Sequence, residues 1–394
     1  MVGQIGDEFD FFIVTTDRDF GDSAPYPGVL TDQWVKVENA LVYYTSPGAR
    51  GLRQLARLMT ETPYDVLYLN SFFDPGFALK PLVARSLGLT SRKPVIIATR
   101  GEFSLGALAL KHWKKKAYIA VLKKFQILHR VTWQASNEGE AADILRVMNR
   151  QDEIVKQRSI TIASDFSEGV SIEASLQTDL NIYISPNLPS GVGGTRPTPS
   201  RAQRHAGQPL RLCFLSRIAR MKNLDYALRV LAEVREPVRF SIYGPEEDAS
   251  YWLECRQLIN ALPANISVEV CGSVEHQHVL ATMAQYDLFF LPTRGENFGH
   301  VIHEALRAGT PVLISDQTPW HQLEDRAVGW AFPLAEPASF ARAIEEVARW
   351  SVECANATAE RASSYAKEVS SNDDVRQANV GLFRDVLSAN AANR

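Results

Sequence analysis

Short apolar runs alternate with longer amphipathic stretches along most of this chain. In the first half, the alternation predicts strands over 9–15, 65–69, 94–99, 131–135, 160–163 and 181–185. The segments between these runs have the spacing of helices, for example over 49–59 and 138–148. Because strands that alternate with helices usually form parallel sheets, the pattern predicts repeated βαβ units and an α/β fold.

The same rhythm restarts in the second half. Strands are predicted over 210–216, 239–244, 266–272, 287–293 and 311–315. Helices are predicted over 223–234, 251–262, 299–308 and 337–350, followed by a helical tail that reaches 387. The second half is therefore also predicted to be doubly wound.

A proline- and glycine-rich stretch separates the two halves. Five prolines and four glycines lie between positions 186 and 209, a composition that cannot hold a helix or a central strand. We therefore predict an N-terminal domain over 1–186, a linker over 187–209, a C-terminal domain over 210–350 and a helical tail over 351–394.

Composition narrows the class of protein. Hydrophobic residues make up 45% and charged residues 22% of the 394 positions, as in ordinary globular domains. The net charge of −3 gives no field that would recruit nucleic acid. The four cysteines form no C-x-x-C motif, and no apolar run reaches the about 18 residues of a spanning helix. These features predict a cytoplasmic protein with reduced thiols.

The segment over 292–320 carries the most chemistry. It reads as a strand, a glycine-bearing loop, a helix and a second strand, and ligands bind at such strand ends in open α/β sheets. Backbone N–H groups at Phe298, Gly299 and His300 would open the helix and could receive a phosphate or sugar oxygen. Glu296 stands before this helix and Glu304 within it, where carboxylates could accept hydrogen bonds from sugar hydroxyls.

This segment resembles the donor site of the retaining glycosyltransferases of family 4. Three other segments, LSRIARMKN, YGPEED and CGSV, agree with the resemblance, which covers about 94–385. The resemblance implies the GT-B fold, in which two Rossmann-like doubly wound domains face a central cleft. It also implies a hexosyltransferase that moves a hexose from a nucleotide diphosphate sugar to a glycan or lipid-linked acceptor, in polysaccharide or cell-surface glycan biosynthesis.

The resemblance also assigns roles to particular residues. It implies that Arg217 and Lys222 hold the donor diphosphate, that Glu296 orients the sugar and that Glu304 anchors the ribose. Fixed positive charge suits a diphosphate leaving group, and these two cations follow a strand and lead into a helix. The rest of the implied donor site comprises the amides at Phe298, Gly299 and His300, together with Gly244 and Val274. No metal and no cofactor is required.

The first half carries a weaker signal. Arg100, Gly101 and Glu102 follow a predicted strand and are expected on the acceptor side. Many family members have a histidine where Arg100 falls. Arg100 is therefore expected to contact either donor phosphate or acceptor, with structural pairing to an acid as the alternative.

A metal site is the main alternative to these fixed cations. Asp17, Arg18 and Asp19 spell D-x-D, which would suggest a metal-dependent glycosyltransferase with a single domain. The motif follows the first predicted strand, where a turn is expected, and nothing downstream fits a single-domain enzyme. His300, His303 and Glu304 spell H-x-x-H-E, which is not the order found in zinc helices. We predict no metal.

The segment over 111–124 contains six lysines and no acid, interleaved with apolar residues. One interpretation is a peripheral contact with the inner face of a membrane. The lysines are spread around the helix axis at helical spacing, so an ordinary solvated helix is the other interpretation.

Two rival functions stay open. One is a nucleotide-sugar epimerase of the same two-domain fold, which works on the donor without an acceptor. The other is a non-catalytic protein that binds sugar nucleotides.

The start of the chain departs from the family. Members begin with a strand, a Gly-rich loop and a helix, whereas 9–15 here resembles their second strand. We expect that the first strand and loop are missing, either because the start codon is placed too late or because the protein is truncated. Such a sheet would leave an unpaired edge.

Overall fold

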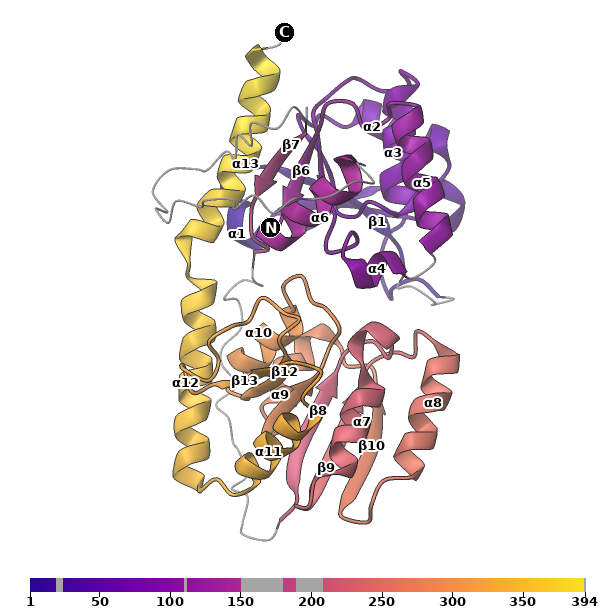
Figure 1. The fold of residues 1–394 in the computed structure, drawn as a ribbon. Coiled ribbons are helices and arrows are strands. Elements are labelled where there is room, and N and C mark those ends of the chain that lie inside the picture. The colour runs from indigo at the N-terminus through magenta and orange to yellow at the C-terminus, as the bar shows by residue number, and fades with distance from the viewer. Residues whose placement is uncertain (19–23, 110–111, 150–179, 189–207, 393–394) are drawn as a thin grey trace. The chain divides into compact units, whose positions relative to one another are not determined.

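The computed structural model describes residues 1–18, 24–109, 112–149, 180–188 and 208–392. The chain divides into two compact units, Met1–Leu188 with Asp373–Arg394, and Pro189–Asn372 (Figure 1). The first unit thus includes the last helix, α13 (Asp373–Ala392), whereas the prediction set 351–394 apart as one tail. The reason is local packing, because α13 buries Phe383 against strands of the first unit.

A four-stranded parallel sheet forms the centre of the first unit. Its strands lie in chain order, β4 (Leu67–Leu69), β5 (Val95–Ala98), β6 (Val131–Ala135) and β7 (Asn181–Ile184). Every residue of β5 and β6 is buried, as expected where helices cover both faces. These strands confirm four of the predicted ones, while the predicted strand over 160–163 lies outside the described residues.

A second sheet in this unit has three strands, in the order β1 (Phe11–Thr16), β3 (Ala40–Thr45) and β2 (Trp34–Val37). β1 runs parallel to β3, whereas β2 and β3 form an antiparallel hairpin that the sequence analysis missed. The hairpin turns at Glu38, which has a φ of 50°. All six residues of β1 stay partly exposed. Within the described residues, β1 and β4 each lie at a sheet edge.

The helices of the first unit pack into two cores. One core joins Phe72, Phe103 and Trp133 to α5 through Ile119 and Leu122. The other joins Ile5 of α1 and Phe383 of α13 to Ile96 and Tyr183 in the sheet, which places α13 beside β7 (Figure 1). The helices of this unit that precede α13 are α1 (Val2–Ile5), α2 (Leu52–Glu61), α3 (Lys80–Ser86), α4 (Leu105–Ala109), α5 (His112–Lys124) and α6 (Glu138–Asn149).

The second unit contains one six-stranded parallel sheet in the order β10-β9-β8-β11-β12-β13. This is the Rossmann order, in which the winding reverses between β8 and β11. The doubly wound architecture predicted for the second half is confirmed. The strands are β8 (Leu210–Leu215), β9 (Val238–Tyr243), β10 (Ile266–Gly272), β11 (Leu288–Leu291), β12 (Val312–Ser315) and β13 (Gly329–Phe332).

Helices cover both faces of this sheet. α7 packs against α8 and α11, while α10 packs against α9 and α12 (Figure 1). β11 and β12 are wholly buried between the two groups. Of these helices, only the short α9 escaped the sequence analysis, as did the strand β13. The helices are α7 (Leu224–Ala232), α8 (Ala249–Asn260), α9 (Val279–Met283), α10 (His300–Arg307), α11 (Pro337–Ala348) and α12 (Val352–Ser370).

A buried histidine fixes α10 to α12. The Nε2 atom of His303 lies 2.9 Å from the Ser370 hydroxyl and 3.1 Å from the Ala366 carbonyl oxygen. The imidazole stacks on Trp320 with ring centroids 6.0 Å apart, and the Trp320 indole N–H donates to the Phe298 carbonyl oxygen. Nδ1 is buried and has no hydrogen-bond partner among the described residues. Burial therefore lowers the pKa of His303 to about 4.

This depressed pKa predicts a pH-dependent stability. Unfolded His303 binds its proton near pH 6.5, whereas the folded side chain resists it down to about pH 4. The free energy of unfolding of the second unit should therefore fall as pH drops through this window, by about 3 kcal/mol at its lower end. Urea unfolding followed by tryptophan fluorescence at a series of pH values measures it.

The control is His303→Gln, which does not titrate but keeps an N–H donor. This variant should be less stable than the wild type at pH 7 and should lose less stability toward pH 4.5. An unchanged pH slope in the variant would show that other groups cause the effect.

Candidate active site

Two loops meet where the sheet of the second unit reverses its winding. One loop follows β8 and the other follows β11, and ligands of Rossmann-like sheets bind at this position. The Arg294 amide donates to the Met221 carbonyl oxygen at 2.8 Å, and the Thr293 hydroxyl donates to the same oxygen at 3.1 Å. These two hydrogen bonds thus hold the two loops together.

Asn223 secures the same junction. Its φ of 62° is left-handed, a conformation that asparagine tolerates better than most residues. The side-chain amide donates to the Pro292 carbonyl oxygen at 2.9 Å, and its oxygen accepts from Arg294 at 3.0 Å. The sequence analysis did not single out Asn223, although an asparagine directly after Lys222 at a helix start was a usable signal.

Lys222 and Glu296 form an ion pair across this junction. The two residues are 74 positions apart in sequence, and only 14% and 12% of their side chains are exposed. The structure therefore brings together two residues that were predicted separately. The pair thus places one positive and one negative group side by side at this junction, largely shielded from water.

Arg217 lies at the end of β8 and is more exposed. Its guanidinium pairs with Glu247 at 2.8 Å, with 60% of the side chain open to solvent. Gly244 ends the neighbouring strand with a φ of 133°, and a Cβ atom there would stand 1.9 Å from the Ser216 carbonyl oxygen. Only glycine allows the ends of β8 and β9 to approach this closely. Val274, which follows β10, packs partly buried against the core.

The start of α10 is shaped by Gly299. Its φ of 76° is left-handed, and it occupies the N-cap position directly before His300. The first hydrogen bonds of the helix are donated by Ile302 and His303 to the Gly299 carbonyl oxygen. The amides of Phe298, Gly299 and His300 therefore lie ahead of this ladder, where the helix dipole favours an anion.

Glu304 lies in α10 and is almost fully buried. Its carboxylate is 3.7 Å from the Nδ1 atom of His276, which is itself exposed. Burial raises the pKa of Glu304, and the neighbouring His276 and Arg307 oppose that shift. A carboxylate in this setting gains from neutral hydrogen-bond donors such as hydroxyl groups.

In the first unit, Arg100 follows β5 with a φ of 51°. Its guanidinium donates to Asn70 Oδ1 at 2.7 Å and to the Tyr68 hydroxyl at 2.6 Å. The expected alternative, an ion pair with an acid, is not found within the described ranges. Gly101 is left-handed as well, with a φ of 76°.

Glu102 holds the loop that follows β4. It accepts hydrogen bonds from the Ser71 hydroxyl at 2.8 Å and from the amides of Phe72 and Phe73 at 2.6 and 3.2 Å. These bonds engage both carboxylate oxygens. Any effect of Glu102 on a substrate would therefore act through the position of this loop.

Glu140 is a buried carboxylate that the sequence analysis missed. It accepts from the Thr99 hydroxyl and the Gly101 amide, both at 2.6 Å, and from the amide and hydroxyl of Ser136, both at 2.8 Å. These bonds join the ends of β5 and β6. The available signal was an acid in the first turn of a helix directly after a strand.

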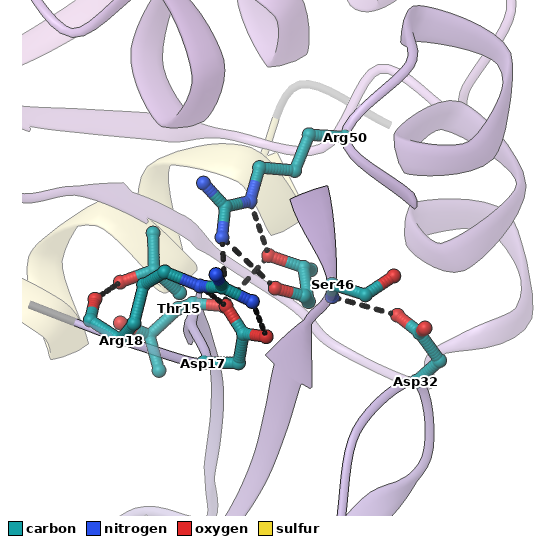
Figure 2. A network of polar contacts seen from close by, with 8 residues as sticks. Thr15, Asp17, Arg18, Asp32, Ser46 and Arg50 are labelled. Atoms are coloured by element: carbon teal, nitrogen blue, oxygen red, sulfur yellow. Dashed lines mark hydrogen bonds and ion pairs between the residues drawn. The ribbon is translucent and has the colours of Figure 1, made fainter. Parts of the chain in front are cut away.

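Asp17 does not have the surroundings of a metal ligand (Figure 2). The Arg18 guanidinium binds its two oxygens at 2.9 and 2.8 Å, and Arg50 adds a contact of 3.1 Å. The hydrogen bonds from Arg18 lower the pKa of Asp17. Asp19, the other acid of the D-x-D motif, lies outside the described residues. No group of three or more potential metal-binding side chains occurs in the part of the chain that the structure describes.

Residues 196–369 match the family model described as glycosyl transferases group 1. Among solved structures, sucrose-phosphate synthase from Thermosynechococcus elongatus superposes with a TM-score of 0.64 at 15% identity, over 96% of this chain and 89% of that one. Anabaena Alr3699/HepE in complex with UDP-glucose gives 0.59 at 16% identity, over 88% and 86%. A glycosyltransferase from Rickettsia africae gives 0.59 at 11% identity, over 89% and 86%.

Two curated proteins are similar in sequence. The GPI3 subunit of yeast phosphatidylinositol N-acetylglucosaminyltransferase is 24% identical over 38% of this chain and 33% of its own length. An uncharacterized 41.2 kDa protein in the cps region of Klebsiella pneumoniae is 24% identical over 64% and 60%. The matched regions thus span a third to three fifths of these relatives.

The structural matches confirm the predicted GT-B fold of two Rossmann-like units. The family match falls on the second unit, which holds the Lys222–Glu296 pair and α10. The second unit of the chain therefore matches the glycosyl transferases group 1 family model, and the whole chain has the GT-B fold.

Proposed function

We propose that this protein is a retaining glycosyltransferase of family 4. It transfers a hexose from a nucleotide diphosphate sugar to a glycan or lipid-linked acceptor. The observation that carries the proposal is the Lys222–Glu296 ion pair at the winding reversal of the second sheet. The similar structure of Anabaena Alr3699/HepE in complex with UDP-glucose supports a nucleotide sugar as the donor.

The ion pair supplies both charges that the donor needs. When a diphosphate binds, Lys222 exchanges the Glu296 carboxylate for phosphate oxygens and stabilises the negative charge that develops as the glycosidic bond breaks. Glu296 is then free to accept hydrogen bonds from sugar hydroxyls and so to orient the ring. Arg217 exchanges Glu247 for a second phosphate in the same way.

The remaining donor contacts come from backbone and from α10. The amides of Phe298, Gly299 and His300 receive a phosphate oxygen at the positive end of the helix dipole. Glu304 accepts hydrogen bonds from the ribose hydroxyls, which compensate for the burial of its carboxylate. Val274 flanks the nucleobase, and Gly244 keeps the ends of two strands close. Fixed cations and amides neutralise the diphosphate here, so the proposal includes no metal and no cofactor.

The first unit supplies the acceptor side through the turn at Arg100 and Gly101. Glu140 accepts a hydrogen bond from the Gly101 amide, and Glu102 joins this turn to the loop that follows β4.

A role in polysaccharide or cell-surface glycan biosynthesis is proposed because a sequence relative is encoded in the cps region of Klebsiella. The epimerase alternative is not favoured, because the family match is to glycosyl transferases. A non-catalytic binding protein would bind the donor but release no nucleotide diphosphate in the presence of an acceptor.

The helix α5 favours a peripheral membrane contact. Trp113, Val121 and Phe125 are exposed and lie on one stripe of the helix or directly after it, at multiples of four residues. Lys114 and Lys124 fall within the same arc of the helix and are also exposed. We propose a cytoplasmic protein that binds the inner face of an anionic membrane through 111–124. Lys111 lies outside the described residues, and none of the described helices is long and apolar enough to cross a membrane.

Other lysines of the same segment have structural roles. Lys115 donates to the Ala107 carbonyl oxygen at 2.7 Å. Lys123 donates to the carbonyl oxygens of Val147 and Met148, at the end of α6. The spread of lysines around the helix axis therefore combines structural lysines with exposed ones.

The first functional prediction concerns Lys222. Lys222→Ala should lower the rate of nucleotide diphosphate release by about 100- to 1,000-fold, because a preorganised cation at a developing charge is lost. The rate is measured with a panel of nucleotide sugars and acceptors, and circular dichroism verifies the fold. Arg220→Gln is the matched control, since that nearby cation pairs with Glu254 at 2.6 Å and should be dispensable. Near-wild-type turnover in folded Lys222→Ala protein would refute the assignment.

Chelation tests the metal-free account. Activity should be unchanged after incubation with EDTA, because Lys222, Arg217 and the helix amides neutralise the diphosphate. A complete loss that manganese restores would instead support a metal-dependent enzyme.

Vesicle binding tests the membrane contact. The protein should sediment with phosphatidylglycerol vesicles and not with phosphatidylcholine vesicles, and added salt should weaken the binding. The double variant Lys114→Gln, Lys124→Gln should bind about 30-fold more weakly, because each lysine near an anionic surface contributes about 1 kcal/mol.

Leu253→Ser is the matched apolar control, since this exposed leucine lies on α8 of the second unit. It should bind vesicles like the wild type, whereas Trp113→Ser should not. Equal binding by the wild type and the lysine variant would rule out the proposed surface.

A further inference from the structure

Arg100 is a cation without a counter-ion in the described part of the chain. Its two hydrogen-bond acceptors, Asn70 Oδ1 and the Tyr68 hydroxyl, are both neutral. Burial raises the pKa of Tyr68 to about 12, so its hydroxyl keeps its proton. Arg18, Arg50, Arg57 and Arg146 of the same unit each contact a carboxylate, whereas Arg85, like Arg100, donates to neutral oxygens.

The backbone at this position is held against its preference. A left-handed arginine costs about 1–2 kcal/mol, and strain of this kind persists only where the surroundings impose it. Here Glu140 imposes it by binding the Thr99 hydroxyl and the Gly101 amide on either side of Arg100. A glycine or an asparagine would adopt the same turn at lower cost, so the turn by itself does not require an arginine.

A chain of hydrogen bonds that begins at the Tyr68 hydroxyl also fixes the Arg100 guanidinium. The Tyr68 hydroxyl donates to Gln134 Oε1, and the Gln134 amide donates to the Ser185 carbonyl oxygen at 3.0 Å. Asn379 of α13 donates to the Pro186 carbonyl oxygen at 2.9 Å and so secures the same strand end. β4, β6, the end of β7 and α13 therefore determine where Arg100 stands. Such preorganisation lowers the entropic cost of binding a ligand, because the guanidinium is already ordered.

We propose that Arg100 binds an anionic group, a carboxylate or a phosphate, of the sugar acceptor. The planar guanidinium matches either oxyanion through paired N–H donors, and it is only partly buried at the carboxyl edge of the sheet. Assigning the anion to the acceptor rests on the proposed function, in which Lys222, Arg217 and α10 of the second unit already neutralise the donor diphosphate.

The experiment observes the guanidinium directly. Protein labelled with ¹⁵N-arginine is titrated with inorganic phosphate, glucuronate and glucose in the Lys222→Gln background, which weakens phosphate binding at the donor site. The Nε–Hε signal of Arg100 is assigned by its loss in Arg100→Gln. Phosphate, glucuronate or both should shift this signal saturably, whereas glucose should not. Whichever anion binds more tightly distinguishes a lipid-phosphate acceptor from an acidic-sugar acceptor.

Arg57 is the matched control, because it is exposed and paired with Glu61 at 2.6 Å. Its signal should not shift saturably, and Tyr68→Phe should weaken anion binding at Arg100 at least threefold by removing one of its two supports. The proposal is overturned if the Arg100 signal responds to neither anion, or no more than that of Arg57. Binding of UDP by the wild type and its loss in Lys222→Gln tests the donor site separately, so the two failures can be distinguished.

Discussion

The candidate site depends on one ion pair, Lys222–Glu296, at the place where the second sheet reverses its winding. Removing two charges from water is costly, and their mutual attraction repays the cost only with good geometry. The geometry is good here because Asn223 and Arg294 fix the two loops independently of the pair. These hydrogen bonds do not involve the ion pair, so the proposed exchange of its partners for a diphosphate and a sugar would leave them in place.

The two units reach their stability in different ways. The second unit has one continuous parallel sheet, and its strands β11 and β12 are wholly buried. The first unit has two sheets, and all six residues of β1 stay partly exposed. In the first unit, buried or partly buried carboxylates at strand ends hold neighbouring loops and strands together. Asp17 and Glu140 each bind groups from two loops or strand ends. Glu102 joins its own loop to the loop that follows β4.

The local pattern was enough to predict β11, α10 and β12. The buried strands are continuous apolar runs and the helix is amphipathic, and glycine and proline residues mark where these elements begin and end. The hairpin of β2 and β3 was missed although its local pattern was sufficient, because WVKVENALVYYT alternates around a two-residue turn. Glu140 and Asn223 each had a local signal, an acid in the first turn of a helix and an asparagine at a helix start. Their distant partners, Thr99 and Pro292, could not be read from the sequence, because they lie 41 and 69 residues away and only the folded chain brings them within hydrogen-bonding distance.

The number of hydrogen bonds that a carboxylate accepts distinguishes the structural carboxylates from the candidate functional one, Glu304. Glu140 accepts four hydrogen bonds and Glu102 three, so their oxygens are already compensated for burial. Glu304 is buried to a degree similar to Glu140, yet within the described residues it accepts no side-chain hydrogen bond, and its charged neighbours are His276, at 3.7 Å, and Arg307. Burial raises the pKa of Glu304 because the nearby His276 and Arg307 offset only part of the loss of hydration. A buried carboxylate with unfilled acceptors lowers its free energy by binding hydroxyl groups, which is what a ribose supplies.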